Sequence, residues 1–380
     1  MFLSRLALFA SVATAVIIPG PPGPYSVTLK VQTFEDAERW DPYAPEDQPE
    51  KRRVLASIFV PRKDANCTIE VVPYMPPATA AIFGLQAASY GLPDDITQSL
   101  ELELCEAGQT CTSKNKYPLV FFSPGRGGSR LMYNILARSL ASYGYVVVAL
   151  DHTYDTAIIE FPDGSVRYVA NSTNNDRDYV EGLVQARQED VSFIIDQFAN
   201  PSVVGPIFAG TQATVDLDRI FVFGHSLGGA TAASSVYADD RVLGGLNLDG
   251  MMNGPVTSEG TDKPFVVAGT PSSRGYIPSW NETWENLRGP ALLASINGTT
   301  HMSFIDAPQL PTVLALPAEY GPLLDAIFGT TDGKTIGKVV IELVRSALGF
   351  VFDGKTDGIC NVENIAPEVD QVEIKGLSCS

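Results

Sequence analysis

The sequence predicts an α/β fold with a doubly wound, mostly parallel sheet and helices on both faces. Short, continuous apolar runs recur along the chain, and helical segments separate them. A continuous apolar run is typical of a strand buried on both faces, as in parallel sheets. Alternating strands and helices with right-handed crossovers then build a doubly wound sheet. The predicted strands are Tyr117–Phe122, Tyr145–Leu150, Arg219–Phe223, Val242–Leu248, Phe265–Gly269 and Ala291–Ile296.

The helices follow from apolar side chains spaced for one helical face. Segment Asp178–Phe198 shows this spacing most clearly, and Leu131–Tyr143 and Ala230–Tyr237 also lie between predicted strands. A further amphipathic helix is expected at Thr335–Phe352. Docking on the core is favoured for it over membrane insertion, because Lys338, Glu342 and Arg345 lie off its apolar face.

The chain before the first buried strand is expected to be less regular. Segments Ser26–Thr33 and Val54–Val60 alternate apolar with polar residues and predict an antiparallel start, joined by a surface connection. Residues 64–116 hold three cysteines and many prolines. Their apolar part, Val71–Leu85, suits packing against the sheet best, with a substrate mouth or lipid contact as the alternative. Farther along, Pro162-Asp163-Gly164 predicts a hairpin.

The N-terminus resembles a secretory signal peptide over residues 1–18. Arg5 supplies a positive charge, Leu6–Val12 an apolar core and Ala13-Thr14-Ala15 a small-residue cleavage site. The apolar run is too short to cross a bilayer, although Val16–Ile18 would lengthen an uncleaved anchor. We therefore expect a secreted, extracellular protein with one hydrolase domain over 19–355 and a tail over 356–380.

Acceptor sequons and cysteines fit export. The N-glycosylation motif occurs at Asn66, Asn171, Asn281 and Asn297. The five cysteines are expected to form disulfides in an oxidising compartment. Cys360 with Cys379 would pin the tail, whereas the pairing among Cys67, Cys105 and Cys111 stays open. The cysteine spacing resembles no zinc module, and we expect no metal or cofactor.

The net charge of −18 comes from acidic residues spread along the chain. It disfavours nucleic acid and anionic membrane surfaces as partners. It is compatible with a neutral or zwitterionic small-molecule or lipid substrate and transient contact with a lipid surface. Solubility alone would also account for this charge.

A nucleophile motif lies at Gly224-His225-Ser226-Leu227-Gly228. It matches G-x-S-x-G, with an apolar strand before it and a small-residue helix after it. This strand–turn–helix context is that of a nucleophile elbow, in which flanking glycines allow a sharp turn. Ser226 is therefore the predicted nucleophile, and the fold class narrows to the α/β-hydrolases.

The base can be found by elimination, since the chain has three histidines. His225 is adjacent to Ser226, and His152 precedes it, whereas the elbow folds place serine, acid and histidine in that order. His301 follows the last predicted parallel strand and is the predicted base.

The acid must lie at the carboxyl edge of the sheet, between Ser226 and His301. Asp249 ends the strand after the elbow and meets this requirement. The other nearby carboxylates end the elbow helix or precede a strand, which is the wrong edge. The loop after the next strand, residues 269–274, has no carboxylate.

Two backbone N–H groups are expected to form the oxyanion hole. One belongs to Leu227, at the start of the elbow helix. The other is assigned to Arg126, within the glycine-rich loop 123–128 after the first buried strand.

Together these segments resemble the plasma and type II platelet-activating-factor acetylhydrolases. The resemblance covers roughly residues 50–310 and is carried by Tyr-Pro-Leu-Val-Phe-Phe-Ser-Pro-Gly (117–125), Gly-His-Ser-Leu-Gly-Gly (224–229), Leu-Asp-Gly (248–250) and Thr-His-Met-Ser-Phe (300–304). It implies calcium-independent hydrolysis of short or oxidised acyl groups at the sn-2 position of phospholipids. Pro124 and Arg126 depart from the family, which usually has histidine and an apolar residue there.

The sequence thus predicts a secreted serine esterase for short-acyl esters, with platelet-activating-factor-like lipids as the first candidates. A general carboxylesterase or a cutinase-like polyester hydrolase is the alternative enzyme. A catalytically idle hydrolase fold used for binding is the alternative from another class, and the intact set of Ser226, Asp249 and His301 argues against it.

Overall fold

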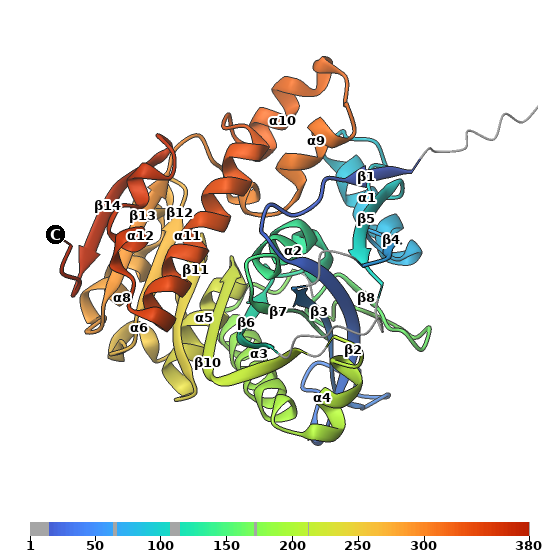
Figure 1. The fold of residues 1–380 in the computed structure, drawn as a ribbon, viewed down its shortest axis with the longest axis horizontal. Coiled ribbons are helices and arrows are strands. Elements are labelled where there is room, and N and C mark those ends of the chain that lie inside the picture. The colour runs from blue at the N-terminus through green and yellow to red at the C-terminus, as the bar shows by residue number, and fades with distance from the viewer. Residues whose placement is uncertain (1–14, 64–66, 107–114, 171–172, 212, 380) are drawn as a thin grey trace, which may run out of the picture.

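The computed structural model describes residues 15–63, 67–106, 115–170, 173–211 and 213–379. Its centre is a nine-stranded sheet in the order β14-β13-β12-β11-β10-β6-β7-β3-β2 (Figure 1). Neighbours from β7 to β13 are parallel, whereas β2, β3 and β14 run antiparallel to their neighbours. The strands are β2 (Ser26–Trp40), β3 (Lys51–Arg62), β6 (Asn115–Ser123), β7 (Val146–His152), β10 (Ala213–His225), β11 (Val242–Leu248), β12 (Phe265–Gly269), β13 (Ala291–Ile296) and β14 (Val369–Lys375).

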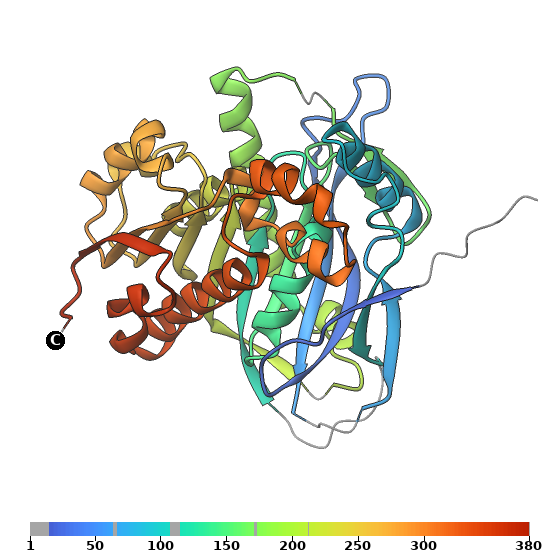
Figure 2. The same ribbon diagram turned by 90° about the horizontal axis from the view of Figure 1, so that it is seen from above.

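Helices cover both faces of this sheet, so the predicted α/β-hydrolase fold class is confirmed. Helices α2 (Asn134–Ala141) and α11 (Gly333–Asp353) pack on one face, and α3 (Arg177–Phe198) and α5 (Leu227–Ala238) on the other (Figure 2). Side chains alternate between the faces along each strand. On β10, Phe221 and Phe223 join the core under α2 and α11, while Ile220 and Val222 join the core under α3 and α5.

A small second sheet and a helix precede the first parallel strand. The sequence predicts a less regular chain there. A three-stranded sheet has the order β1-β5-β4, and helix α1 leads from β4 towards β5. Ile18 in β1 is only 1% exposed. The strand β1 pairs with Leu100–Leu102, so cleavage after Ala15 would retain this strand. These elements are β1 (Val16–Ile18), β4 (Ile69–Pro73), α1 (Pro77–Ser89) and β5 (Leu100–Cys105).

The expected surface connection after Thr33 is partly strand. β2 continues to Trp40, where it still pairs with Lys51. Its extension is held by ion pairs, because Arg52 on β3 contacts the buried carboxylates of Asp41 and Asp190. The predicted hairpin is present as β8 (Ile158–Glu160) and β9 (Val166–Tyr168).

The segment expected as a C-terminal tail contributes to the main sheet. Strand β14 pairs antiparallel with β13, and a disulfide joins Cys360 to Cys379 around it. The remaining elements are η1 (Arg130–Tyr133), α4 (Pro201–Ile207), α6 (Val256–Glu259), α7 (Ser273–Tyr276), α8 (Pro278–Asn286), η2 (His301–Phe304), η3 (Ala307–Gln309), α9 (Leu310–Val313), η4 (Ala318–Tyr320), α10 (Gly321–Phe328), α12 (Thr356–Cys360) and η5 (Val362–Asn364).

No helix within the described ranges is both long and apolar enough to cross a membrane.

Candidate active site

Ser226 lies in the sharp turn between β10 and α5. Its φ of 56° and ψ of −123° fall outside the regions that residues other than glycine usually adopt. The glycines on either side are required by close backbone contacts. A Cβ on Gly224 would lie 2.3 Å from the carbonyl oxygen of Gly228, and one on Gly228 would lie 1.9 Å from that of Ser123. The turn therefore has the geometry of a nucleophile elbow.

His301 and Asp249 lie in line with this serine. The Oγ of Ser226 is 2.9 Å from Nε2 of His301, and Nδ1 of His301 is 2.7 Å from Oδ2 of Asp249. A carboxylate only accepts hydrogen bonds, so Nδ1 of neutral His301 carries the proton and Nε2 accepts from the serine hydroxyl. This is the hydrogen-bond order of a serine, a base and an orienting acid.

Asp249 is held rigidly at the end of β11. Its Oδ1 accepts hydrogen bonds from the backbone N–H of Thr270 at 2.8 Å and from Oγ of Ser273 at 2.5 Å. Its side chain is buried, whereas that of His301 is 50% exposed. The acid is thus shielded from water while the base faces the solvent. Among the other carboxylates between Ser226 and His301, Asp239 pairs with Arg241, Glu259 with Tyr237 and Asp262 with Arg288.

A cleft of about 450 Å³ opens above these three side chains. Met251 and Tyr276 line it and are largely exposed, at 54% and 85%. Thr270 and Thr300 also line it. A small ester can therefore approach Ser226 from solvent.

The glycine-rich loop after β6 runs directly beside the serine. A Cβ on Gly125 would lie 3.3 Å from Cβ of Ser226. Arg126 comes next, and its guanidinium is directed to Asn174 and Asn175, with hydrogen bonds of 2.6 and 2.8 Å. Across from this loop, Leu227 begins α5, where the first N–H groups of a helix have no partner within the helix. Both expected oxyanion donors thus belong to backbone segments that flank Ser226.

His225, the residue before the nucleophile, makes hydrogen bonds to two other parts of the site. Its Nε2 donates to the carbonyl oxygen of His301 at 2.9 Å, so its Nδ1 accepts from the hydroxyl of Tyr133 at 2.8 Å. That hydroxyl in turn accepts a 3.4 Å hydrogen bond from the N–H of Gly125. Burial lowers the pKa of His225 to about 3. A neutral imidazole therefore ties the elbow to the base and to the glycine-rich loop.

Arg187 supports the same loop from helix α3. The buried guanidinium donates to the carbonyl oxygens of Pro124 at 2.6 Å and Gly125 at 3.4 Å. Asp155 neutralises it through two hydrogen bonds of 2.6 and 2.7 Å. Although burial alone would raise the pKa of Asp155, Arg187 lowers it below the usual value.

His152, rejected as the base, belongs to a buried chain beneath that loop. Its Nε2 lies 3.0 Å from Oγ of Ser123, and its Nδ1 lies 2.9 Å from Oδ2 of Asp190. All three side chains are buried, so this second serine–histidine–aspartate chain has a structural role. Sequence reasoning missed Arg187, Tyr133 and Asp190. The available signal was the pair Arg187 and Asp190, which falls on the apolar face of α3 between Val184 and Val191.

Two disulfides are present among the described residues, Cys67–Cys105 and Cys360–Cys379. Cys111 lies outside the described residues, as do the acceptor residues Asn66 and Asn171. Asn281 is exposed on α8. Asn297 is half-buried, and its Nδ2 donates to Asp370 at 3.4 Å.

Comparison with known proteins shows which family the chain resembles. Residues 86–198 and 203–267 match the family model for platelet-activating factor acetylhydrolase, isoform II. An Arthroderma benhamiae protein named "Probable 1-alkyl-2-acetylglycerophosphocholine esterase" is 28% identical over 375 residues, covering 93% of this chain and 92% of that protein. The chain is thus similar to the platelet-activating factor acetylhydrolase family. The resemblance predicted from the motifs is thereby confirmed.

Two further comparisons agree with this similarity. The platelet-activating factor acetylhydrolase of Canis lupus familiaris is 30% identical over 262 residues, which is 61% of this chain and 55% of that protein. The matches to it and to the Bos taurus enzyme thus span about half the length of these mammalian relatives, 55% and 48%. A solved structure, the ferulic acid esterase from Streptomyces cinnamoneus, superimposes with a TM-score of 0.73 at 26% identity, covering 91% of this chain and 96% of that one.

Proposed function

We propose that the protein is a secreted serine esterase that removes short acyl groups from esters, above all the sn-2 acetyl group of platelet-activating-factor-like phospholipids. The observation that carries this proposal is the hydrogen-bonded line from Ser226 through His301 to Asp249. The names of the family and of the Arthroderma benhamiae relative support the substrate class.

In the proposed reaction, His301 Nε2 takes the proton of Ser226 as Oγ attacks the ester carbonyl. Asp249 holds the imidazole by Nδ1 and stabilises its charged form. The N–H groups of Leu227 and Arg126 stabilise the oxyanion of the tetrahedral intermediate. His301 then gives the proton to the leaving alkoxide, which departs as the lyso-lipid. Water, deprotonated by His301, hydrolyses the acyl-enzyme and regenerates Ser226.

The decisive experiment replaces the nucleophile. Ser226→Ala is expected to reduce kcat for p-nitrophenyl acetate by about 10⁴-fold or more. Labelling by a fluorophosphonate probe is expected to disappear as well, whereas the thermal unfolding midpoint should change little. Ser123→Ala is the matched control, because this serine also contacts a histidine but is buried. Full activity of the Ser226 variant would refute the mechanism.

The similarity to the ferulic acid esterase favours one alternative, a general carboxylesterase or polyester hydrolase. Rates on 1-alkyl-2-acetylglycerophosphocholine, p-nitrophenyl acetate, a feruloyl ester and a cutin-like polyester would separate these functions. The proposed function requires the highest kcat/KM on the acetylated phospholipid. A higher value on the feruloyl ester or the polyester would assign the alternative.

Secretion is part of the proposal and rests on residues 1–18. N-terminal sequencing of protein recovered from culture medium is expected to begin near Val16, since β1 starts there and is paired with β5. Recovery of the chain only inside the cell, with Met1 retained, would contradict secretion.

A further inference from the structure

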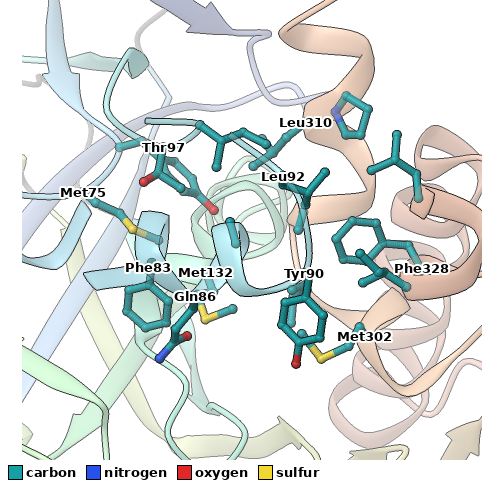
Figure 3. A pocket seen from close by; sticks show the side chains of 18 residues that line it. Met75, Phe83, Gln86, Tyr90, Leu92, Thr97, Met132, Met302, Leu310 and Phe328 are labelled. Carbon is teal, nitrogen blue, oxygen red and sulfur yellow. The ribbon is translucent and has the colours of Figure 1, made fainter. Parts of the chain in front are cut away.

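Figure 3 shows a second pocket, which has an apolar lining. It has a volume of about 110 Å³ and is enclosed by helix α1, the segment after η2 and helix α10. Three methionines, Met75, Met132 and Met302, face it together with Phe83 and Phe328. Methionine side chains are flexible and adapt to apolar ligands of irregular shape.

The pocket offers few polar groups to a ligand. Two of the polar residues in its wall already have partners in the protein. The hydroxyl of Tyr74 donates to Asp306 at 2.8 Å, and that of Thr97 donates to the carbonyl oxygen of Ala80 at 3.1 Å. Such a lining favours a hydrocarbon chain and disfavours a head group or a sugar.

The chain at the start of η2 lines both this pocket and the catalytic cleft. Thr300 and His301 line the cleft, and the next residue, Met302, lines the pocket. The hydroxyl of Thr300 donates to the carbonyl oxygen of Ile327, which also lines the pocket, at 2.6 Å. The side chain of His301 in the cleft is 50% exposed, and Tyr90, which lines the pocket, is 55% exposed, so each hollow has a wall residue in contact with solvent.

The opposite wall is continuous with the glycine-rich loop. Met132 lies on η1, the turn that follows residues 123–128, and its neighbour Tyr133 contacts His225 of the elbow. Met132 on η1 and Met302 on η2 thus connect the pocket wall to the two chain segments beside the reacting ester. When the ester of a lipid lies at Ser226, the apolar chain of that lipid can therefore enter this pocket.

We propose that this pocket binds the long alkyl chain of the lipid whose short acyl ester is cleaved at Ser226. The inference rests on the proposed function and adds a chain-binding site to it. Burial of a chain gains about fourfold in affinity for each methylene that leaves water. Affinity should therefore rise with chain length until the pocket is filled, while small esters without such a chain should not use the pocket.

The test uses alkylphosphocholines, which carry one chain and no cleavable ester. Butyl, hexyl, octyl and dodecyl members, each below its critical micelle concentration, are tested as competitive inhibitors of p-nitrophenyl acetate hydrolysis. For the wild type, the inhibition constant is expected to fall about two- to fourfold per added methylene among the shorter members and to level off once the pocket is filled.

Two tryptophan variants on helix α1 make the matched pair. Ala87 lines the pocket, and its neighbour Ala88 is exposed and does not. Ala87→Trp is expected to abolish the dependence on chain length, and Ala88→Trp to preserve it. Neither change should affect the rate on p-nitrophenyl acetate alone, and thermal unfolding checks that both variants fold.

The outcomes separate the two proposals. Absence of p-nitrophenyl acetate hydrolysis and probe labelling in the wild type would refute the esterase function itself. Intact hydrolysis with inhibition independent of chain length, or with the same length dependence in Ala87→Trp, would refute the chain-binding pocket. Loss of phosphatidylcholine vesicle binding in Ala87→Trp with unchanged inhibition constants would assign the pocket to a membrane surface and also overturn the inference.

Discussion

The guanidinium of Arg187 lies 2.6 Å from the carbonyl oxygen of Pro124, so a buried charge on helix α3 holds the loop beside the candidate nucleophile. Its partner Asp155 also lies 3.5 Å from the N–H of Gly127. The ion pair thus contacts the loop at both ends of Gly125-Arg126. We infer that Arg187 positions the N–H of Arg126 without touching the substrate.

Arg187→Lys should reduce kcat by about 10- to 100-fold with little change in KM, because a displaced oxyanion donor weakens transition-state binding more than substrate binding. Steady-state kinetics on p-nitrophenyl acetate checks this. A buried charge left alone destabilises the fold, so Arg187→Gln combined with Asp155→Asn serves as the control. We expect this double variant to regain the thermal stability that Arg187→Gln alone loses. Its kcat should nevertheless stay below that of the wild type. Full recovery of kcat would show that Arg187 acts only on stability.

His225 should not titrate in the activity profile, although it is adjacent to Ser226. Burial lowers its pKa to about 3, and burial also lowers the pKa of His152. We therefore expect neither of these two buried histidines to account for the acid limb of kcat/KM. The profile of a His225→Asn variant should keep the midpoint of this limb while its plateau falls. A limb that shifts by a full pH unit in that variant would assign the ionisation to His225.

The parts of the site that sequence alone predicts are those encoded by local geometry. A strand, a turn with glycines at both flanks and a helix identify Ser226 without knowledge of the rest of the chain. The order of the motifs along the chain, together with the carboxyl edge of a parallel sheet, singles out Asp249 and His301. The structure brings these three side chains within hydrogen-bond distance.

The supporting residues could not be predicted, because their partners are remote in sequence. Arg52 meets Asp190 at a separation of 138 residues, and Tyr133 meets His225 at a separation of 92. No local pattern specifies which buried charge pairs with which. Strand β14 falls within the predicted tail, because a half-exposed edge strand lacks the continuous apolar run of a central strand.

Asp306 should make stability depend on pH near neutrality. It is buried, and burial raises its pKa from 3.8 to about 7 despite hydrogen bonds from Tyr74 and the N–H of Ile135. The folded state therefore binds this proton more tightly than the unfolded state. Protonation of Asp306 contributes its full amount to the free energy of unfolding below about pH 4, and this contribution is lost as the pH rises towards about 7. In urea unfolding, wild type should lose stability relative to Asp306→Asn across this window, whereas the exposed Asp325→Asn should follow the wild type. Parallel pH curves for wild type and Asp306→Asn would contradict the assignment.

The Cys360–Cys379 disulfide should stabilise the fold without affecting catalysis. It spans 19 residues and encloses β14, the edge strand that pairs with β13. A cross-link over a loop of this length contributes about 3 kcal/mol by restricting the unfolded chain. We therefore expect Cys360→Ser combined with Cys379→Ser to lose about that much unfolding free energy while kcat on p-nitrophenyl acetate stays near the wild-type value.

The matched variant without Cys67 and Cys105 tests the other cross-link, which ties β4 to β5 across 38 residues. A drop in kcat of the folded Cys360/Cys379 variant would show that β14 also positions β13 and the His301 loop that follows it.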